Sequence, residues 1–339
     1  MKPFLPTLTI ALCVLTIVCL WALSVGQFAI PTSEIFSLVA AKLIGVTTPP
    51  SAEMANANVV LFEIRAPRIA SAWIVGAALS AAGAAYQNLF RNPLVSPDIL
   101  GVSSGAALGA VLGIFLSMPI MAIQGMAFGG GLLAVALIFM VGNKLRGHDP
   151  MLSLVLTGVV VGSLLASGLA LLKYLADPTN QLPAITYWLL GSFSSVTPRD
   201  AGITALIFIA SLTPLFLMRW RINLLSLPDD EARALGVNVN RDRLIIIIAA
   251  TLMTATSVAL CGMIGWVGLV VPHAVRLLVG AEFSRLLPVS IIVGGTFMLV
   301  VDTLCRTLTQ IEIPPGVLTA AIGTPIFLLL MAATLRGKR

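Results

Sequence analysis

The chain has 339 residues, of which 58% are hydrophobic and only 10% are charged. Soluble domains average about 25% charged residues, so this composition excludes a soluble globular protein and indicates a chain that crosses a membrane many times. The apolar segments lack strand-like alternation, and a helix satisfies its own backbone hydrogen bonds in lipid. We therefore predict an all-α polytopic membrane protein, whose length accommodates about ten spans of roughly 20 residues.

The formal net charge of +6 does not point to nucleic acid, because no basic run is interleaved with aromatic residues. We interpret it as loop charge that sets the orientation in the membrane. The cysteines lie in or beside apolar segments without CxxC spacing, so neither a metal site nor a disulfide framework is predicted. They are Cys13, Cys19, Cys261 and Cys305.

The first half of the chain predicts five spans. The first apolar run is longer than a signal-peptide core of about 7–15 residues, so it is expected to be a retained span. The third span carries Gly101, Gly105, Gly109 and Gly113, whose four-residue spacing predicts a helix face that another backbone approaches closely. The expected spans are 5–29, 69–90, 98–117, 121–142 and 151–175, with a short interfacial helix at 33–44.

The second half predicts five more apolar helices around the longest charged segment, residues 219–243. In that segment, Asp229 to Glu231 follow Pro228, where acidic side chains complement the positive end of a helix. Gly236 is the expected stop of this helix. The expected spans are 200–218, 244–263, 286–305 and 316–335, with a short segment at 184–190 and a short eighth helix starting near Pro272.

The distribution of basic residues predicts the topology. Ten spans place both termini on one side, and a cytoplasmic placement puts 14 of the 20 lysines and arginines on the inner side. This agrees with the positive-inside rule. Proline-containing breaks introduce the third span and the eighth helix, so spans 2–5 and 7–10 are expected to form inverted halves, as in many transporters.

Several motifs occur in an order and spacing that resemble one family. They are RAPR at 65–68, RNPLVSPDILGVSSGA at 91–106, ALGVNV at 234–239, IGWVGLVVPHAVRLLVG at 264–280 and IPPGVLTAAIGTPIF at 313–327. The chain resembles the FecCD family, the permease subunits of binding-protein-dependent type II ABC importers for iron chelates, haem and cobalamin. The first 60 residues match only in general character, and Pro314 stands where the family more often has leucine.

The resemblance implies a single transmembrane permease domain over residues 1–339, with residues 219–243 as its cytoplasmic coupling loop. It further implies a second permease chain in a homodimer, two ATP-binding cassette subunits and a periplasmic substrate-binding protein, in a bacterial inner membrane. The sequence has no G-x-x-x-x-G-K-[ST] phosphate-binding motif. ATP hydrolysis is therefore expected in a separate subunit, and this chain is expected to be a transport subunit without a cofactor.

Arg65, Arg68 and Arg306 are expected together at the outer surface, where guanidinium groups grip carboxylates in a bidentate manner. The resemblance implies that they dock glutamates of the binding protein. The alternative is that they mark the membrane boundary by snorkelling.

The resemblance also implies a coupling helix and a translocation path. The alternative to a coupling helix is a solvated connector. The alternative to a translocation path is that its serines are small packing residues. The coupling residues are Asp229, Asp230, Glu231, Ala232, Arg233, Ala234, Leu235, Gly236 and Val237. The path residues are Ser163, Ser167 and Leu171, with an inner gate at His148, Met151, Leu152 and Ser153.

Ionisable residues within spans support a second hypothesis, an ion- or proton-coupled secondary transporter that acts without an ATPase. His273 and Asp302 would form its relay, although Asp302 also has a helical i,i+4 neighbour in Arg306 that favours a structural role. Motifs of an intramembrane enzyme are absent. The path is nearly uncharged and would not chelate a bare metal ion, so a ferric siderophore is the expected cargo, with haem, cobalamin or molybdate as alternatives.

Overall fold

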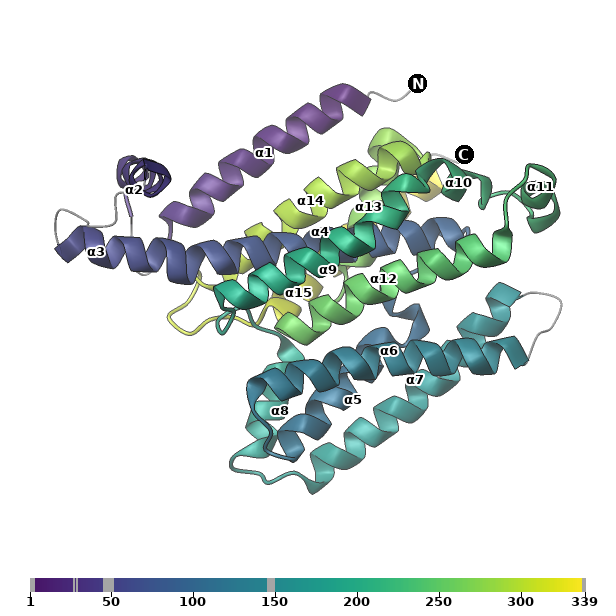
Figure 1. Ribbon diagram of the computed structural model, residues 1–339, viewed down its shortest axis with the longest axis horizontal. Coiled ribbons are helices and arrows are strands. Elements are labelled where there is room, and N and C mark those ends of the chain that lie inside the picture. The colour runs from purple at the N-terminus through teal and green to yellow at the C-terminus, as the bar shows by residue number, and fades with distance from the viewer. Residues whose placement is uncertain (1–3, 27, 29, 45–51, 145–149, 337–339) are drawn as a thin grey trace.

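The computed structural model describes residues 4–26, 28, 30–44, 52–144 and 150–336, and this part of the chain contains helices and no strand (Figure 1). Eight of its helices are long and apolar enough to cross a membrane. Two shorter apolar helices accompany them, which confirms the prediction of about ten. The long elements are α1 (Phe4–Ser24), α4 (Ala66–Leu89), α6 (Ile120–Lys144), α7 (Pro150–Leu175), α9 (Pro198–Leu217), α12 (Val239–Cys261), α14 (Phe283–Cys305) and α15 (Pro315–Arg336).

The remaining elements are short. Two of them are the shorter apolar helices mentioned above, α5 (Val102–Phe115) and α13 (Val267–Val279). The others are α2 (Thr32–Ile44), α3 (Ala52–Val59), the π-helical η1 (Val60–Arg65), the 3₁₀ turn η2 (Pro97–Leu100), α8 (Gln181–Leu190), α10 (Arg219–Leu224) and α11 (Asp229–Ala234). In Figure 1, α11 and the start of α1 lie towards one end of the bundle, and α3 lies towards the other.

The second span is longer than expected. The sequence predicted a start at Ile69, but α3, η1 and α4 form one continuous apolar helix of 36 residues from Met54 to Leu89. Pro67 does not interrupt this helix. The π-helical turn ends directly before α4, and Pro67 lies in the first turn of α4, where a missing N–H is tolerated. Arg65 and Arg68 consequently lie within this helix and not in front of it.

Helix α4 is the buried centre of the bundle and packs against α9, α12, α13 and α14. Small residues bring its backbone close to its neighbours. A Cβ atom on Gly76 would lie 2.2 Å from the carbonyl oxygen of Gly294 in α14. A Cβ atom on Gly83 would lie 1.8 Å from the carbonyl oxygen of Gly268 in α13.

Helix α13 explains that second contact. The sequence predicted that this helix starts near Pro272. It begins instead at Val267, so Pro272 and His273 lie inside the helix. Pro272 has no N–H to donate to the carbonyl of Gly268, four residues earlier. The carbonyl of Gly268 faces Gly83, whose missing side chain leaves room for it.

The two predicted halves pack reciprocally. Helix α4 of the first half contacts α12, α13 and α14, whereas α12 of the second half contacts α4, α5 and α6. Each short helix therefore lies against the long helix of the opposite half, which is the arrangement expected of inverted repeats. The glycine face of α5 also forms as expected, because Gly105 and Gly109 lie against the backbone of α6 at Gly130 and Met126.

Candidate docking and coupling sites

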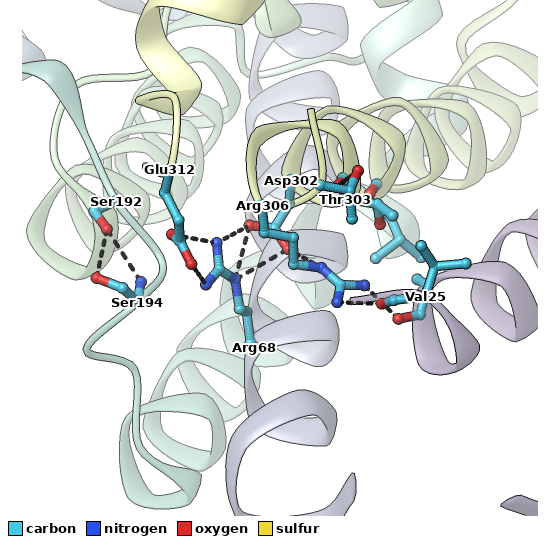
Figure 2. A network of polar contacts seen from close by, with 11 residues as sticks. Val25, Arg68, Ser192, Ser194, Asp302, Thr303, Arg306 and Glu312 are labelled. Carbon is cyan, nitrogen blue, oxygen red and sulfur yellow. Dashed lines mark hydrogen bonds and ion pairs between the residues drawn. The ribbon is translucent and has the colours of Figure 1, made fainter. Parts of the chain in front are cut away.

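A buried ion network surrounds Arg68 of α4 (Figure 2). Its Nε donates to Oδ1 and Oδ2 of Asp302 in α14, at 3.0 and 3.2 Å. Its Nη1 and Nη2 donate to the two carboxylate oxygens of Glu312, at 2.8 and 2.9 Å. The Asp302 side chain is fully buried, whereas that of Glu312 is 42% exposed. This fork-like pairing on two carboxylates is the geometry for which a guanidinium is suited.

The other two arginines hold the end of α1. Arg65 donates from Nη1 to the carbonyl of Leu23 at 2.6 Å, and Arg306 donates from Nη1 to the carbonyl of Val25 at 2.6 Å. Each makes a second bond, to the carbonyls of Phe28 and Ala22 respectively. The carboxyl end of a helix is partially negative and favours cations, so these bonds tie the end of α1 to η1 and to the C-terminal end of α14.

The three arginines are thus brought together, as predicted, but they are largely buried and not exposed to external water. Side-chain exposure is 11% for Arg68 and 9% for Arg306. The expected pair of Arg306 and Asp302 is present, with Nε 3.9 Å from Oδ2, but Arg68 is the closer partner of Asp302. A cavity of about 750 Å³ opens beside Arg306, lined by Gly26 and residues 307–310. The docking role of these arginines stays a prediction.

A helix forms where the sequence predicted the coupling helix. Helix α11 starts after Pro228 with three acidic residues in its first turn. It ends in a Schellman motif, in which Gly236 has a φ of +81° and donates to the carbonyl of Arg233, while Val237 donates to that of Ala232. Among the nine predicted coupling residues, Ala232 and Val237 are buried, and Leu235 is exposed. The other exposed members are Asp230, Glu231, Arg233, Ala234 and Gly236.

Asp229 is less exposed than Asp230 and is held by two arginines. Its carboxylate accepts from Nη2 of Arg91 and from Nη2 of Arg243, both at 3.1 Å. Burial by itself raises the pKa of Asp229, but the hydrogen bonds and charges of Arg243 and Arg91 outweigh this and lower its pKa below the ordinary value. Asp229 is therefore ionised at neutral pH and anchors α11 to the membrane helices.

The residues that follow α11 are also anchored to the helix bundle. Residues 241–243 were expected in the cytoplasmic loop of residues 219–243, but Asp242 and Arg243 are buried and only Arg241 is exposed. Asp242 pairs with Arg221 at 2.8 Å. The cause is that α12 already begins at Val239, so these residues lie in its first turns against the bundle and not in a loop.

Comparison with known proteins identifies the chain. The model of the FecCD transport family matches residues 14–333. The chain belongs to the FecCD transport family. Among curated proteins, it is 38% identical over 325 residues to the molybdate import system permease protein MolB of Haemophilus influenzae, covering 95% of this chain and 94% of MolB.

Two further similarities agree with this membership. An iron chelatin transport system permease protein of Helicobacter pylori strain 26695 is 40% identical over 282 residues, covering 83% of this chain and 85% of the relative. A metal-chelate type ABC transporter, solved in an inward-facing conformation, superposes with a TM-score of 0.84 at 34% identity, covering 97% of this chain and 99% of that one. The FecCD protein is thus a multi-pass permease subunit of an ABC importer, and ATP hydrolysis belongs to separate subunits.

The predicted path residues of the FecCD permease lie along α7. Ser163, Ser167 and Leu171 are exposed and follow each other at helical spacing on one face. The two serine hydroxyls donate to carbonyls of their own helix, at 2.9 Å each. Ser153 donates to the carbonyl of Gly142 and so joins α7 to α6. Met151 and Leu152 lie in the first turn of α7, His148 falls outside the described residues, and the roles of all seven stay predictions.

The residues proposed as the relay of a secondary transporter contact different partners in the FecCD permease. Asp302 pairs with Arg68 and Arg306, as described above. His273 is buried beside Phe327, at 6.4 Å between ring centroids, and within the described part of the chain neither of its nitrogens has a hydrogen-bond partner. Asp302 therefore acts as a structural counter-ion.

Sequence reasoning did not assign to these sites two residues that the structure places there, Glu312 at the outer network and Arg91 at the inner one. Glu312 lies 244 residues from Arg68, and Arg91 lies 138 residues from Asp229. No local spacing reports contacts of that range. Both residues do fall at or next to the family motifs, RNPL at 91–94 and IPPG at 313–316, which was the one available signal.

Proposed function

We propose that this FecCD permease transports a metal chelate, with a ferric siderophore as its substrate, across a bacterial inner membrane. The observation that carries the proposal is the exposed face of α7. Residues 151–172 contain no ionisable side chain, and Ser163, Ser167 and Leu171 are exposed along this face. Hard metal ions need several oxygen ligands. A path lined by this face suits a cargo whose metal is already coordinated.

The relatives support this class of cargo. The Helicobacter pylori relative is named for iron chelatin. Molybdate is the second candidate, because MolB matches nearly the whole chain at 38% identity.

The same face supports a homodimer. Large apolar side chains of α7 are exposed in the isolated chain, and a second copy packed against them would enclose the path between the two subunits. They include Leu152, Leu156, Val159, Val160, Leu164 and Leu171.

We assign the two ends of the bundle to the two partners that the family implies. Arg65, Arg68 and Arg306 would receive carboxylates of a periplasmic binding protein at the outer end, since their three positive charges exceed the two negative charges of Asp302 and Glu312. The exposed side of α11 would enter the ATP-binding subunit at the inner end, with both termini cytoplasmic. Figure 1 supports this orientation, because α11 and the start of α1 lie towards the same end.

The substrate assignment is tested by uptake into proteoliposomes that contain the permease, its genomic ATPase partner and the cognate binding protein. We expect ATP-dependent uptake of a radiolabelled ferric siderophore, unaffected by excess molybdate. Uptake of labelled molybdate without uptake of any iron chelate would contradict the siderophore assignment and favour the second candidate.

The docking assignment gives a separate prediction. Arg306→Gln is expected to lower the stimulation of ATPase activity by the binding protein by about tenfold or more, since a buried charge at an interface is costly to lose. Arg199→Gln is the matched control, because Arg199 lies in the exposed first turn of α9 on the same predicted side. Unchanged stimulation of the Arg306 variant would discard its docking role. Reduced thermal stability with loss of the ATPase subunit would assign Arg306 to folding.

A further inference from the structure

Arg91 reaches from the end of α4 to residues 225–237, which include α11 and which the proposal above places against the ATP-binding subunit. We call these residues the ATPase-facing segment. Its Nη2 donates to Oδ1 of Asp229 at 3.1 Å and to the carbonyl of Leu225 at 3.2 Å, and also bonds to the carbonyl of Leu227. Its Nε donates to the same Leu225 carbonyl at 3.3 Å. One side chain thus holds three successive points of the connection between α10 and α11.

The backbone of Arg91 indicates that this side chain is needed. Helix α4 ends in a Schellman motif, in which Arg91 donates to the carbonyl of Asn88 and Asn92 donates to that of Gln87. Arg91 occupies the left-handed position of this motif, with a φ of +53°. Glycine is the usual residue there, because a side chain is sterically disfavoured. An unfavourable backbone conformation at a non-glycine residue points to a function.

The opposite end of α4 carries Arg68 of the outer network. Between the two, α4 is one uninterrupted α-helix over Ala66–Leu89, and it is buried along most of its length. At 1.5 Å per residue it extends for about 36 Å. A stiff element of this kind connects the two proposed partner surfaces directly.

Two other ion pairs hold the segment independently of Arg91. Arg243 of α12 also binds Asp229, and Arg221 of α10 binds Asp242. Removing Arg91 is therefore expected to leave α11 folded and attached to α12, while it removes the side-chain link between α4 and α11; the direct packing of α10 on α4 is retained.

We propose that Arg91 is a positioning residue that links α4 to the ATPase-facing segment, so that binding-protein engagement at the Arg68 end reaches α11 through this side chain. The inference rests on the docking and coupling roles proposed above. Arginine suits the role because its fork of five donors serves several acceptors at once, which a lysine ammonium does not.

The decisive variant is Arg91→Gly, because glycine relieves the left-handed backbone while it removes the link. The complex of permease, ATPase and binding protein is assayed in lipid nanodiscs. We expect unchanged thermal stability, ATPase co-purification and basal ATPase activity, with stimulation by the binding protein reduced at least about fivefold, the lower range of measured allosteric couplings. Arg91→Lys should retain part of the stimulation. Arg285→Gln, which removes a half-buried pair with Glu282, serves as control.

The binding protein's affinity for each complex is measured in parallel. Normal affinity with lost stimulation in Arg91→Gly supports the inference. Normal stimulation in that variant overturns it, as does an equal loss of basal and stimulated activity, which would mark Arg91 as a structural cap. If the wild-type complex neither binds nor responds to the binding protein, the docking proposal fails and the inference fails with it.

Discussion

Replacing Asp302 with alanine is expected to destabilise the permease by about 3–5 kcal/mol, the cost of breaking a buried ion pair from one side. The Asp302 side chain is fully buried and lies 2.9 Å from Nη2 of Arg68 and 3.9 Å from Nε of Arg306. Its removal leaves two largely buried guanidiniums without their common carboxylate. The measurement is thermal unfolding in detergent, together with the yield of folded protein.

Glu312→Gln is the matched control, because Glu312 binds the same guanidinium from the exposed side. Water can replace an exposed carboxylate, so an effect of about 1 kcal/mol or less is expected. Equal destabilisation of both variants would contradict the buried ion pair of Asp302. So would a melting temperature of Asp302→Ala equal to that of the wild type.

Gly83→Ala is expected to disrupt the contact between α4 and α13, although it adds a single methyl group. The new Cβ would lie 1.8 Å from the carbonyl oxygen of Gly268. The Cβ of alanine is fixed by its own backbone and meets backbone atoms of Gly268, so no side-chain rotation relieves the contact, and the two helices must separate. Overpacking typically costs about 1–3 kcal/mol, and a reduced melting temperature would report it.

The control is Gly125→Ala in α6, where an added Cβ meets no atom within 4 Å among the described residues. Alanine is a better helix former than glycine by about 1 kcal/mol, so this variant is expected to be neutral or slightly stabilised. Equal melting of the two variants would show that α4 and α13 do not pack as closely as described.

The sequence allowed the helices to be located because lipid imposes long apolar runs, and because proline and glycine interrupt them visibly. The Pro228–Gly236 helix was predictable for the same local reasons. The start of α4 was not, since Pro67 signals a helix start equally well whether a π-helical turn or a loop precedes it. Likewise, Pro272 appeared to begin a helix that in fact starts five residues earlier.

The site could be predicted in composition but not in contacts. Arg65, Arg68 and Arg306 were expected together, yet their burial depends on Asp302 and on the end of α1, which the fold alone brings near. Residues 241–243 were expected in the cytoplasmic loop, whereas Asp242 lies buried in the first turns of α12 and pairs with Arg221 from another helix. Long-range ion pairs of this kind leave no periodic signal in a single sequence.

The most direct test of the central claim is uptake by reconstituted permease with its energy source controlled. Proteoliposomes are prepared with and without the ATPase subunit, with ATP inside or absent, and with or without an imposed proton gradient. We predict chelate uptake only when the ATPase, ATP and the binding protein are all present. Uptake that follows the proton gradient in vesicles lacking the ATPase would contradict the assignment as an ABC importer permease.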